Sequence, residues 1–311
     1  MISSSIQLGE RVEHRGIVLV PIFPRRTPVA AYLTLDEASA SGLRVTEIDA
    51  AGSVPELAVE NPLDESVLLY DGEELAGAKQ NRILNVTVLV PARSKLRIPV
   101  SCVEQGRWAA RSVAFAPATH MADPELRRRK NERIAAAPLA RGDAQHEVWN
   151  AISEKAARLG ANSPTSAHAD TFAQHARSIN DVKTAFPLLP GQSGALVALG
   201  PDTLCLDYVS RPDAFARLYP KLLAGYALDA LERLDGPAAP GERLQAFLAE
   251  VIRAQAERQP SEGLGLDLRL NAPGLLGSGL ELDKELIQLS AFTRAAGSEN
   301  IARIARPSRR R

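Results

Sequence analysis

The sequence predicts a mixed α+β protein, and two observations support this class. Up to about residue 115, short runs rich in Val, Ile, Leu and Thr alternate with turn residues and show no helical period. From Asp123 onward, long charged segments carry apolar residues three and four positions apart, which indicates helices. We therefore expect two domains: an all-β sandwich or barrel over residues 1–120, and a helical and α+β region over residues 121–311.

The overall composition is that of a globular protein without a strong charge bias. Apolar residues make up 45% of the chain, and 37 Lys and Arg residues balance 37 Asp and Glu residues. This balance removes the basic field expected of a nucleic-acid binder. The two cysteines and the lack of ~18 consecutive apolar residues argue against a disulfide framework and a membrane span. We expect a cytoplasmic protein with neither nucleic acid nor membrane as a partner.

The clearest strands of the first region are residues 84–90 and 95–103. Both alternate apolar and polar residues, and the Pro-Ala-Arg-Ser stretch between them indicates a hairpin. On the second strand the alternation places Cys102 on the apolar face, where a buried and inert thiol is expected.

The remaining elements follow in order. Helices are expected over residues 124–137, 144–160 and 166–186, and then a strand hairpin over 194–200 and 203–209. Ser210 and Asp213 resemble a capping box for a long helix, which Pro220 should kink or split. A further helix around residues 244–252 precedes strands at 263–270 and 285–292, so we expect an antiparallel sheet with helices on one face. The end of the chain, "RPSRRR", is expected to be a disordered basic tail.

Several apparent motifs fail on closer reading. Gly77 and Lys79 imitate a phosphate-binding loop, but Ala78 separates them and no Ser or Thr follows. The five histidines are too scattered for a standard zinc spacing. His168 and His175 share a predicted helix face, where packing is the expected role.

Two polar clusters stand out against the strand pattern. "DGEELAGAKQNR", residues 71–82, interrupts the apolar runs, and "SCVEQGRW", residues 101–108, ends the predicted hairpin. Strand parity places Glu104 on the same face as Cys102, where a lone carboxylate is costly, so it needs a cationic partner, for which Lys79, Arg82 and Arg107 are the candidates. Because neighbouring strands usually pair, we expect both clusters to meet at one end of the sheet in a concave patch.

The residue types in this patch suit an anionic ligand with a planar ring. In this hypothesis Lys79, Arg82 and Arg107 hold a phosphate, Gln80 and Asn81 orient the ligand, and Trp108 stacks on it. Glu73, Glu74 and Glu104 supply general acid or base, or hold Mg or Mn through oxygen atoms. The alternative is an ion-pair network that joins the strands without any ligand.

The segment 69–108, together with "GQSGALVALG" and "LLAGYALDALERL", resembles the bacterial ARG- and rhodanese-phosphatase-superfamily-associated protein domain, or ARPP, where ARG means ADP-ribosylglycohydrolase. The resemblance covers most of the chain, and "GAKQNR" and "SCVEQGRW" are its most specific elements. It implies a context of ADP-ribose and NAD-handling proteins and no particular reaction. The motif positions that it carries over are Lys79, Gln80, Asn81, Arg82, Cys102, Glu104, Arg107 and Trp108.

Three functions stay open at this stage. The protein is an enzyme acting on a phosphorylated, nucleotide-like small molecule, a non-catalytic module that senses such a ligand or docks on a partner, or a structural assembly protein. A homo-oligomer is compatible with each of them.

Overall fold

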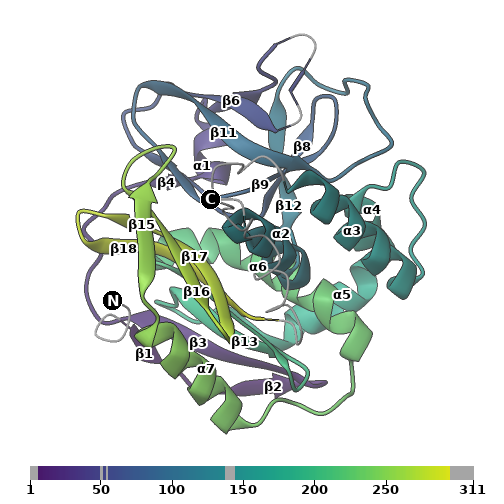
Figure 1. Ribbon diagram of the computed structural model, residues 1–311, viewed down its shortest axis with the longest axis vertical. Helices are drawn as coiled ribbons and strands as arrows, with labels where there is room; N and C mark the ends of the chain where they lie inside the picture. Colours follow the sequence, from purple (N-terminus) through teal and green to yellow (C-terminus); the bar gives the residue numbers. More distant parts are fainter. Residues whose placement is uncertain (1–5, 50–51, 54, 137–143, 295–311) are drawn as a thin grey trace, which may run out of the picture.

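The computed structural model describes residues 6–49, 52–53, 55–136 and 144–294 and confirms the α+β class (Figure 1). The predicted basic tail lies outside the described residues. Within the described ranges, no helix combines the length and apolarity needed to cross a membrane. Cys102 and Cys205 are free and buried, as expected for the first of them.

The upper part of Figure 1 is the predicted β-rich region, which forms a half-barrel. Its larger sheet is antiparallel and contains, in spatial order, β12 (Phe115–Met121), β8 (Glu73–Gly77), β9 (Arg82–Leu84), β11 (Ser94–Cys102), β6 (Glu56–Asn61) and β5 (Arg44–Thr46). A smaller sheet contains β10 (Val88–Val90), β7 (Val67–Leu69) and β4 (Leu33–Thr34), which leads into helix α1 (Leu35–Ala40). Apolar side chains of both sheets and α1 form one core.

The predicted hairpin of residues 84–90 and 95–103 forms only at its base. Arg82–Leu84 pair with Val100–Cys102, but Val88–Val90 leave this sheet and pair with β7. The apolar run is thus divided between two sheets that share a core. Alternation identifies the buried face of a strand without identifying the sheet that the strand joins.

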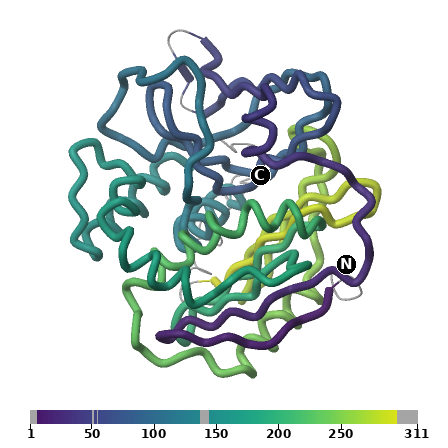
Figure 2. Tube along the Cα trace, turned by 180° about the vertical axis from the view of Figure 1, so that it is seen from behind, coloured from purple at the N-terminus to yellow at the C-terminus, as the bar shows by residue number. Residues whose placement is uncertain are grey.

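The lower part of Figure 1 is a nine-stranded sheet that includes strands from both ends of the chain. Its main path contains β1 (Ile6–Leu8), β3 (Ile17–Pro24), β13 (Gly194–Leu199), β14 (Thr203–Val209), β18 (Glu285–Thr293), β17 (Leu275–Leu282), β16 (Leu266–Ala272) and β15 (Ala256–Pro260), and β2 (Val12–His14) pairs with β3. In Figure 2 the purple N-terminal strands form one edge of this sheet. The domain boundary near residue 120 stays a prediction, and the sheet takes strands from both sides of it.

Helices cover both faces of the nine-stranded sheet, where the sequence analysis expected one face. Helix α6 (Pro212–Ala230) packs on one face and α7 (Gly241–Arg253) on the other, each within its own apolar core. The hairpin β13–β14 is confirmed.

Helix α6 runs unbroken through Pro220 into the short helix η1 (Leu231–Arg233), so the expected split is absent. Its N-cap is Arg211, which makes no side-chain cap hydrogen bond, so the expected capping box is absent as well. Burial of nearly the whole helix outweighs the local cost of the proline.

The first two predicted central helices are confirmed as α2 (Pro124–Ala136) and α3 (Gln145–Leu159). The helix predicted over residues 166–186 is instead two helices, α4 (His168–Gln174) and α5 (Ala176–Ala185), which meet at His175, so His168 and His175 do not share one helix face. Helix α2 lies between the two parts of the molecule in Figure 1, where it contacts α3, α6 and β17. The helices therefore connect the β-rich region to the nine-stranded sheet.

A buried carboxylate, Asp207 on β14, joins these layers. It accepts hydrogen bonds from both terminal nitrogens of Arg127 at 3.0 and 2.7 Å, from Tyr70 at 2.7 Å and from Tyr226 at 2.6 Å. Burial raises the pKa of Asp207, but the Arg127 guanidinium outweighs burial and holds that pKa below its ordinary value. Helices α2 and α6, strand β14 and the residue that follows β7 thus converge on one charge.

Candidate functional site

Strand β8 directs its two adjacent carboxylates in opposite directions, as successive residues of a strand do. Glu73 lies 3.1 Å from Lys221 on α6 and accepts a hydrogen bond from the Tyr70 amide at 3.0 Å. Burial raises the pKa of Glu73. Glu74 is on the other side, with the polar block, so Glu73 does not share a site with Glu74 and Glu104.

The two polar clusters of the sequence do meet, and Asn81 links them. Its backbone amide donates to Glu104 at 3.3 Å, and its side-chain amide donates to Glu74 at 3.0 Å. Arg107 donates to Glu104 at 2.5 Å and to Asn81 Oδ1 at 3.2 Å. The pairing of β9 with β11, which sets Arg82 opposite Cys102, brings the clusters together. We call Glu74, Asn81, Glu104 and Arg107 the Asn81 network.

The predicted cationic partner of Glu104 is Arg107, and both side chains are buried. Burial raises the pKa of Glu104, but the charge and hydrogen bond of Arg107 together with hydrogen bonds from Asn81 and Thr165 outweigh burial and hold that pKa below its usual value. Arg107 also donates to the carbonyl oxygens of Ala78 and Ala109, at 2.7 and 2.9 Å. Its guanidinium is therefore largely committed to the protein. Burial also raises the pKa of the Cys102 thiol, in keeping with an inert residue.

The remaining motif residues form a patch next to this network, which we call the Trp108 surface: Lys79, Gln80, Arg82 and Trp108. The indole of Trp108 is 49% exposed, with Lys79 Nζ at 5.2 Å and Arg82 Cζ at 5.7 Å from its ring. Arg82 is buried and donates to Gln80 at 2.7 Å, while its Nε and Nη2 make no hydrogen bond within the described part of the chain. A buried guanidinium whose N–H groups lack hydrogen-bond acceptors is an uncommon arrangement.

Glu74 lies between two histidines, His120 and His168, which have no standard metal-ligand spacing in the sequence. Nε2 of His120 lies 3.0 Å from Glu74 Oε2, and Nδ1 of His168 lies 3.5 Å from the same oxygen. A bulge in β12 positions His120, because Ala118, Thr119 and His120 lie opposite the single residue Glu74 of β8. His168 begins α4, and its backbone amide donates to the Val103 carbonyl at 2.9 Å, which ties it to the end of β11.

Asp123 completes this group from the other side of His168. Its Oδ2 lies 3.1 Å from His168 Nε2. Burial lowers the pKa of His168, but the neighbouring carboxylates of Asp123 and Glu74 outweigh burial and raise that pKa to about 9. For Glu74, burial is outweighed mainly by His120, and its pKa falls to about 2. His168 thus lies between two carboxylates. We call Glu74, His120 and His168 the Glu74–histidine cluster.

A second group of carboxylates contains its own cation. Asp123, Glu125 and Asp229 converge, and Lys155 Nζ lies 3.1, 3.0 and 2.6 Å from them. Lys155 thus supplies one positive charge that the three carboxylates share. The Glu74–histidine cluster is the other group within the described ranges whose ligand atoms lie within 4.8 Å of one another.

A cavity of about 330 Å³ adjoins the Glu74–histidine cluster. His120, Thr119, Phe172, Asn180 and Lys183 are among its lining residues, and the His120 ring stacks on Phe172 at 4.1 Å. No sequence spacing signalled this arrangement, since His120 and His168 come from separate elements that only tertiary packing brings together. The spacing of the histidines in the sequence therefore did not reveal this cluster.

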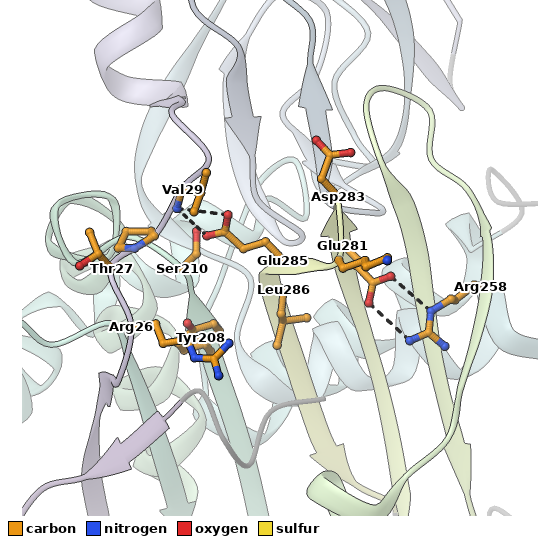
Figure 3. A pocket seen from close by; sticks show the side chains of 12 residues that line it. Arg26, Thr27, Val29, Tyr208, Ser210, Arg258, Glu281, Asp283, Glu285 and Leu286 are labelled. Carbon is orange, nitrogen blue, oxygen red and sulfur yellow. Dashed lines mark hydrogen bonds and ion pairs between the residues drawn. The ribbon is translucent and has the colours of Figure 1, made fainter.

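A larger cavity, of about 540 Å³, lies between residues 26–29 and the turn that joins β17 to β18 (Figure 3). Arg26, Arg258 and Lys284 face an equal number of acidic side chains. Figure 3 shows Glu281 paired with Arg258, and Glu285 accepting a hydrogen bond from the backbone of Val29. Its charges are balanced and it contains no motif residue, so we do not assign the function to it.

The fold and the site define an α+β protein in which a buried carboxylate–histidine cluster adjoins a cavity. The chain belongs to the ARPP-1 family: the model of the ARG and Rhodanese-Phosphatase-superfamily-associated Protein domain matches residues 5–292. No curated protein and no solved structure matches the chain. The family match confirms the resemblance stated above, covers both sheets, and identifies no ligand.

Proposed function

We propose that this protein binds a phosphorylated, nucleotide-like small molecule, of the kind derived from ADP-ribose or NAD, at the Trp108 surface. The observation that carries the proposal is the half-exposed indole of Trp108 beside the cations Lys79 and Arg82. An indole offers a face for a planar base, and the cations suit a phosphate. Arg107, Asn81 and Glu104 support this surface through their mutual hydrogen bonds.

Any catalytic step is assigned to Glu74. Of the three carboxylates predicted as catalytic, Glu73 is engaged by Lys221 and Glu104 by Arg107. Glu74 adjoins the cavity through His120. A carboxylate whose pKa is about 2 is ionised at neutral pH and is only a weak base, so it suits a metal ligand rather than a general acid.

Binding is tested by tryptophan fluorescence and thermal stability with ADP-ribose, NAD and adenosine. We expect ADP-ribose or NAD to raise the melting temperature and quench fluorescence, and adenosine, which lacks phosphate, to bind more weakly. Because stacking is worth roughly 1–3 kcal/mol per base, Trp108→Ala should weaken binding about 5- to 150-fold. Lys79→Ala should also weaken it, whereas Lys95→Ala, at an exposed lysine paired with Glu60, is the matched control. Equal affinity of all variants would overturn the proposal.

Product formation decides between an enzyme and a sensing or docking module. Chromatography of ADP-ribose and NAD after incubation should show product that disappears in Glu74→Gln if the protein is an enzyme. Stabilisation without product supports the non-catalytic module. If no compound raises the melting temperature and no product forms, a structural assembly protein becomes the preferred function.

A further inference from the structure

The donor atoms of the Glu74–histidine cluster are spaced as metal ligands are. Metal–ligand distances of about 2.0–2.1 Å place neighbouring donors of a tetrahedral site roughly 3.3 Å apart. Glu74 Oε2 lies 3.0 Å from His120 Nε2 and 3.5 Å from His168 Nδ1. Two of the three donor pairs therefore already have this spacing.

The surroundings orient these donors. Asp123 binds Nε2 of His168, which leaves Nδ1 directed at Glu74, and a carboxylate on the far nitrogen of a histidine is the usual support of a metal ligand. Asn81 holds the other oxygen, Oε1, of Glu74. His168 is buried, and its Nδ1 makes no hydrogen bond to any described residue. A buried imidazole nitrogen that faces a carboxylate at 3.5 Å without a hydrogen bond is the observation that points to a missing ligand.

The second carboxylate group differs from the Glu74–histidine cluster in the partner of its carboxylates. That group holds Lys155 among its carboxylates. Glu74, in contrast, forms ion pairs only with His120 and His168 among the residues described. No described lysine or arginine pairs with Glu74, whose two partners are histidines that can themselves bind a metal ion.

We propose that Glu74, His120 and His168 bind a divalent transition-metal ion that opens onto the cavity lined by His120 and Phe172. Two imidazole nitrogens and one carboxylate are typical of zinc and ferrous iron, whereas magnesium prefers oxygen ligands. Three protein ligands leave positions for water or an anion, and Lys183 and Asn180 line the cavity where such an anion would lie. The metal site goes beyond the Trp108 surface, and it does not require a nucleotide.

The test is direct metal binding by the full chain without any nucleotide. After chelator treatment, the protein is titrated with Zn²⁺, Fe²⁺ (anaerobically) or Mg²⁺, with calorimetry for affinity and elemental analysis for stoichiometry. We expect one zinc or iron ion per chain, a higher melting temperature with that ion, and much weaker binding of magnesium. His120→Gln and Glu74→Gln should abolish this binding, and Asn81→Ala should weaken it roughly 10- to 100-fold, because it removes a support of Glu74.

Two controls separate this site from others. His146→Gln changes an exposed histidine on α3, and Glu125→Gln changes the group that Lys155 occupies, so both variants should bind the metal normally. If Glu74→Gln fails to fold, His120→Gln still decides the question because His120 lies partly in the cavity. Absence of a bound ion, or unchanged binding in His120→Gln, would overturn the proposal.

Discussion

Asn81 donates a hydrogen bond to Glu74 across 3.0 Å while its own side-chain oxygen accepts one from Arg107 at 3.2 Å. One amide thus connects the carboxylate beside the histidines with the buried Glu104–Arg107 pair. An amide suits this position because it donates at one end and accepts at the other. Neither aspartate nor leucine can satisfy both neighbours.

Asn81→Ala should therefore destabilise the protein even without ligand or metal. Hydrogen bonds to charged groups are worth about 1.5–3 kcal/mol, and we expect a loss of that size in the free energy of unfolding, measured with urea. Asn81→Asp should cost at least as much, because it brings a third carboxylate next to Glu74 and Glu104. Asn150→Ala, at an exposed position of α3, should change stability by less than about 0.5 kcal/mol. An equally small effect of Asn81→Ala would contradict this account.

Asp207→Asn should be among the most damaging single substitutions. It leaves the buried Arg127 without its carboxylate, and breaking a buried ion pair costs about 3–5 kcal/mol. Tyr226→Phe removes only one hydrogen bond to the same carboxylate and should cost about 1.5–3 kcal/mol. Chemical denaturation of both variants should show this order, and the reverse order would contradict it.

The cost of Asp207→Asn should depend on pH. The folded-state pKa of Asp207 is below its ordinary value, so its stabilisation is complete above the unfolded pKa and is lost as pH falls towards the folded value. Below a pH of roughly 3.9, the difference between wild type and variant should shrink by up to about 1.4 kcal/mol per pH unit. Unfolding curves at several pH values from neutral to acid measure this difference. A constant difference would show that the charge of Asp207 is not the cause.

Gly72→Ala tests the turn that separates Asp71 from Glu73. Gly72 has φ +86°, and an added Cβ would lie 2.8 Å from Arg127 Cδ. Arg127 cannot move away easily, since Asp207 anchors it. The left-handed backbone costs alanine roughly 1–2 kcal/mol, and the overlap adds about 1–3 kcal/mol. Gly191→Ala has a similar φ of +77° with open space around it, so it should show the backbone cost alone. Equal losses in the two variants would contradict the predicted overlap.

Lys155→Gln should convert an ion-pair group into a cation site. The substitution leaves Asp123, Glu125 and Asp229 without their shared cation, and we expect a loss of about 3–5 kcal/mol. Calcium binds clustered carboxylates, so millimolar Ca²⁺ should recover part of the melting temperature in the variant and have little effect on the wild type. No difference in the calcium response between the two proteins would contradict the role given to Lys155.

Strand parity and adjacency predicted much of this arrangement. The expected meeting of the two polar clusters follows from the pairing of β9 with β11, and the buried Glu104 has the arginine partner that its burial requires. The same parity rule places Glu73 and Glu74 on opposite sides, which the grouping of both as catalytic residues did not use.

The position of the two histidines beside Glu74 could not be predicted from the sequence, for a physical reason. His120 reaches Glu74 through a bulge, and His168 through a hydrogen bond between the start of α4 and Val103. Neither contact leaves a periodic pattern in the sequence. Helix α6 is a similar case, because tertiary burial maintains it through Pro220 where local propensity predicts a break.

The pairing of β3 with β13 also affects the order in which the protein can fold as it is synthesised. Leu19 lies opposite Val197, so β3 emerges from the ribosome long before its neighbour exists. At about 5–20 residues per second, translation leaves β3 without β13 for roughly 10–35 s. During that time only β1 and β2 can pair with it, and its apolar side chains stay open to non-native contacts. The nascent chain must therefore keep its first strands unaggregated until the middle of the protein has been made.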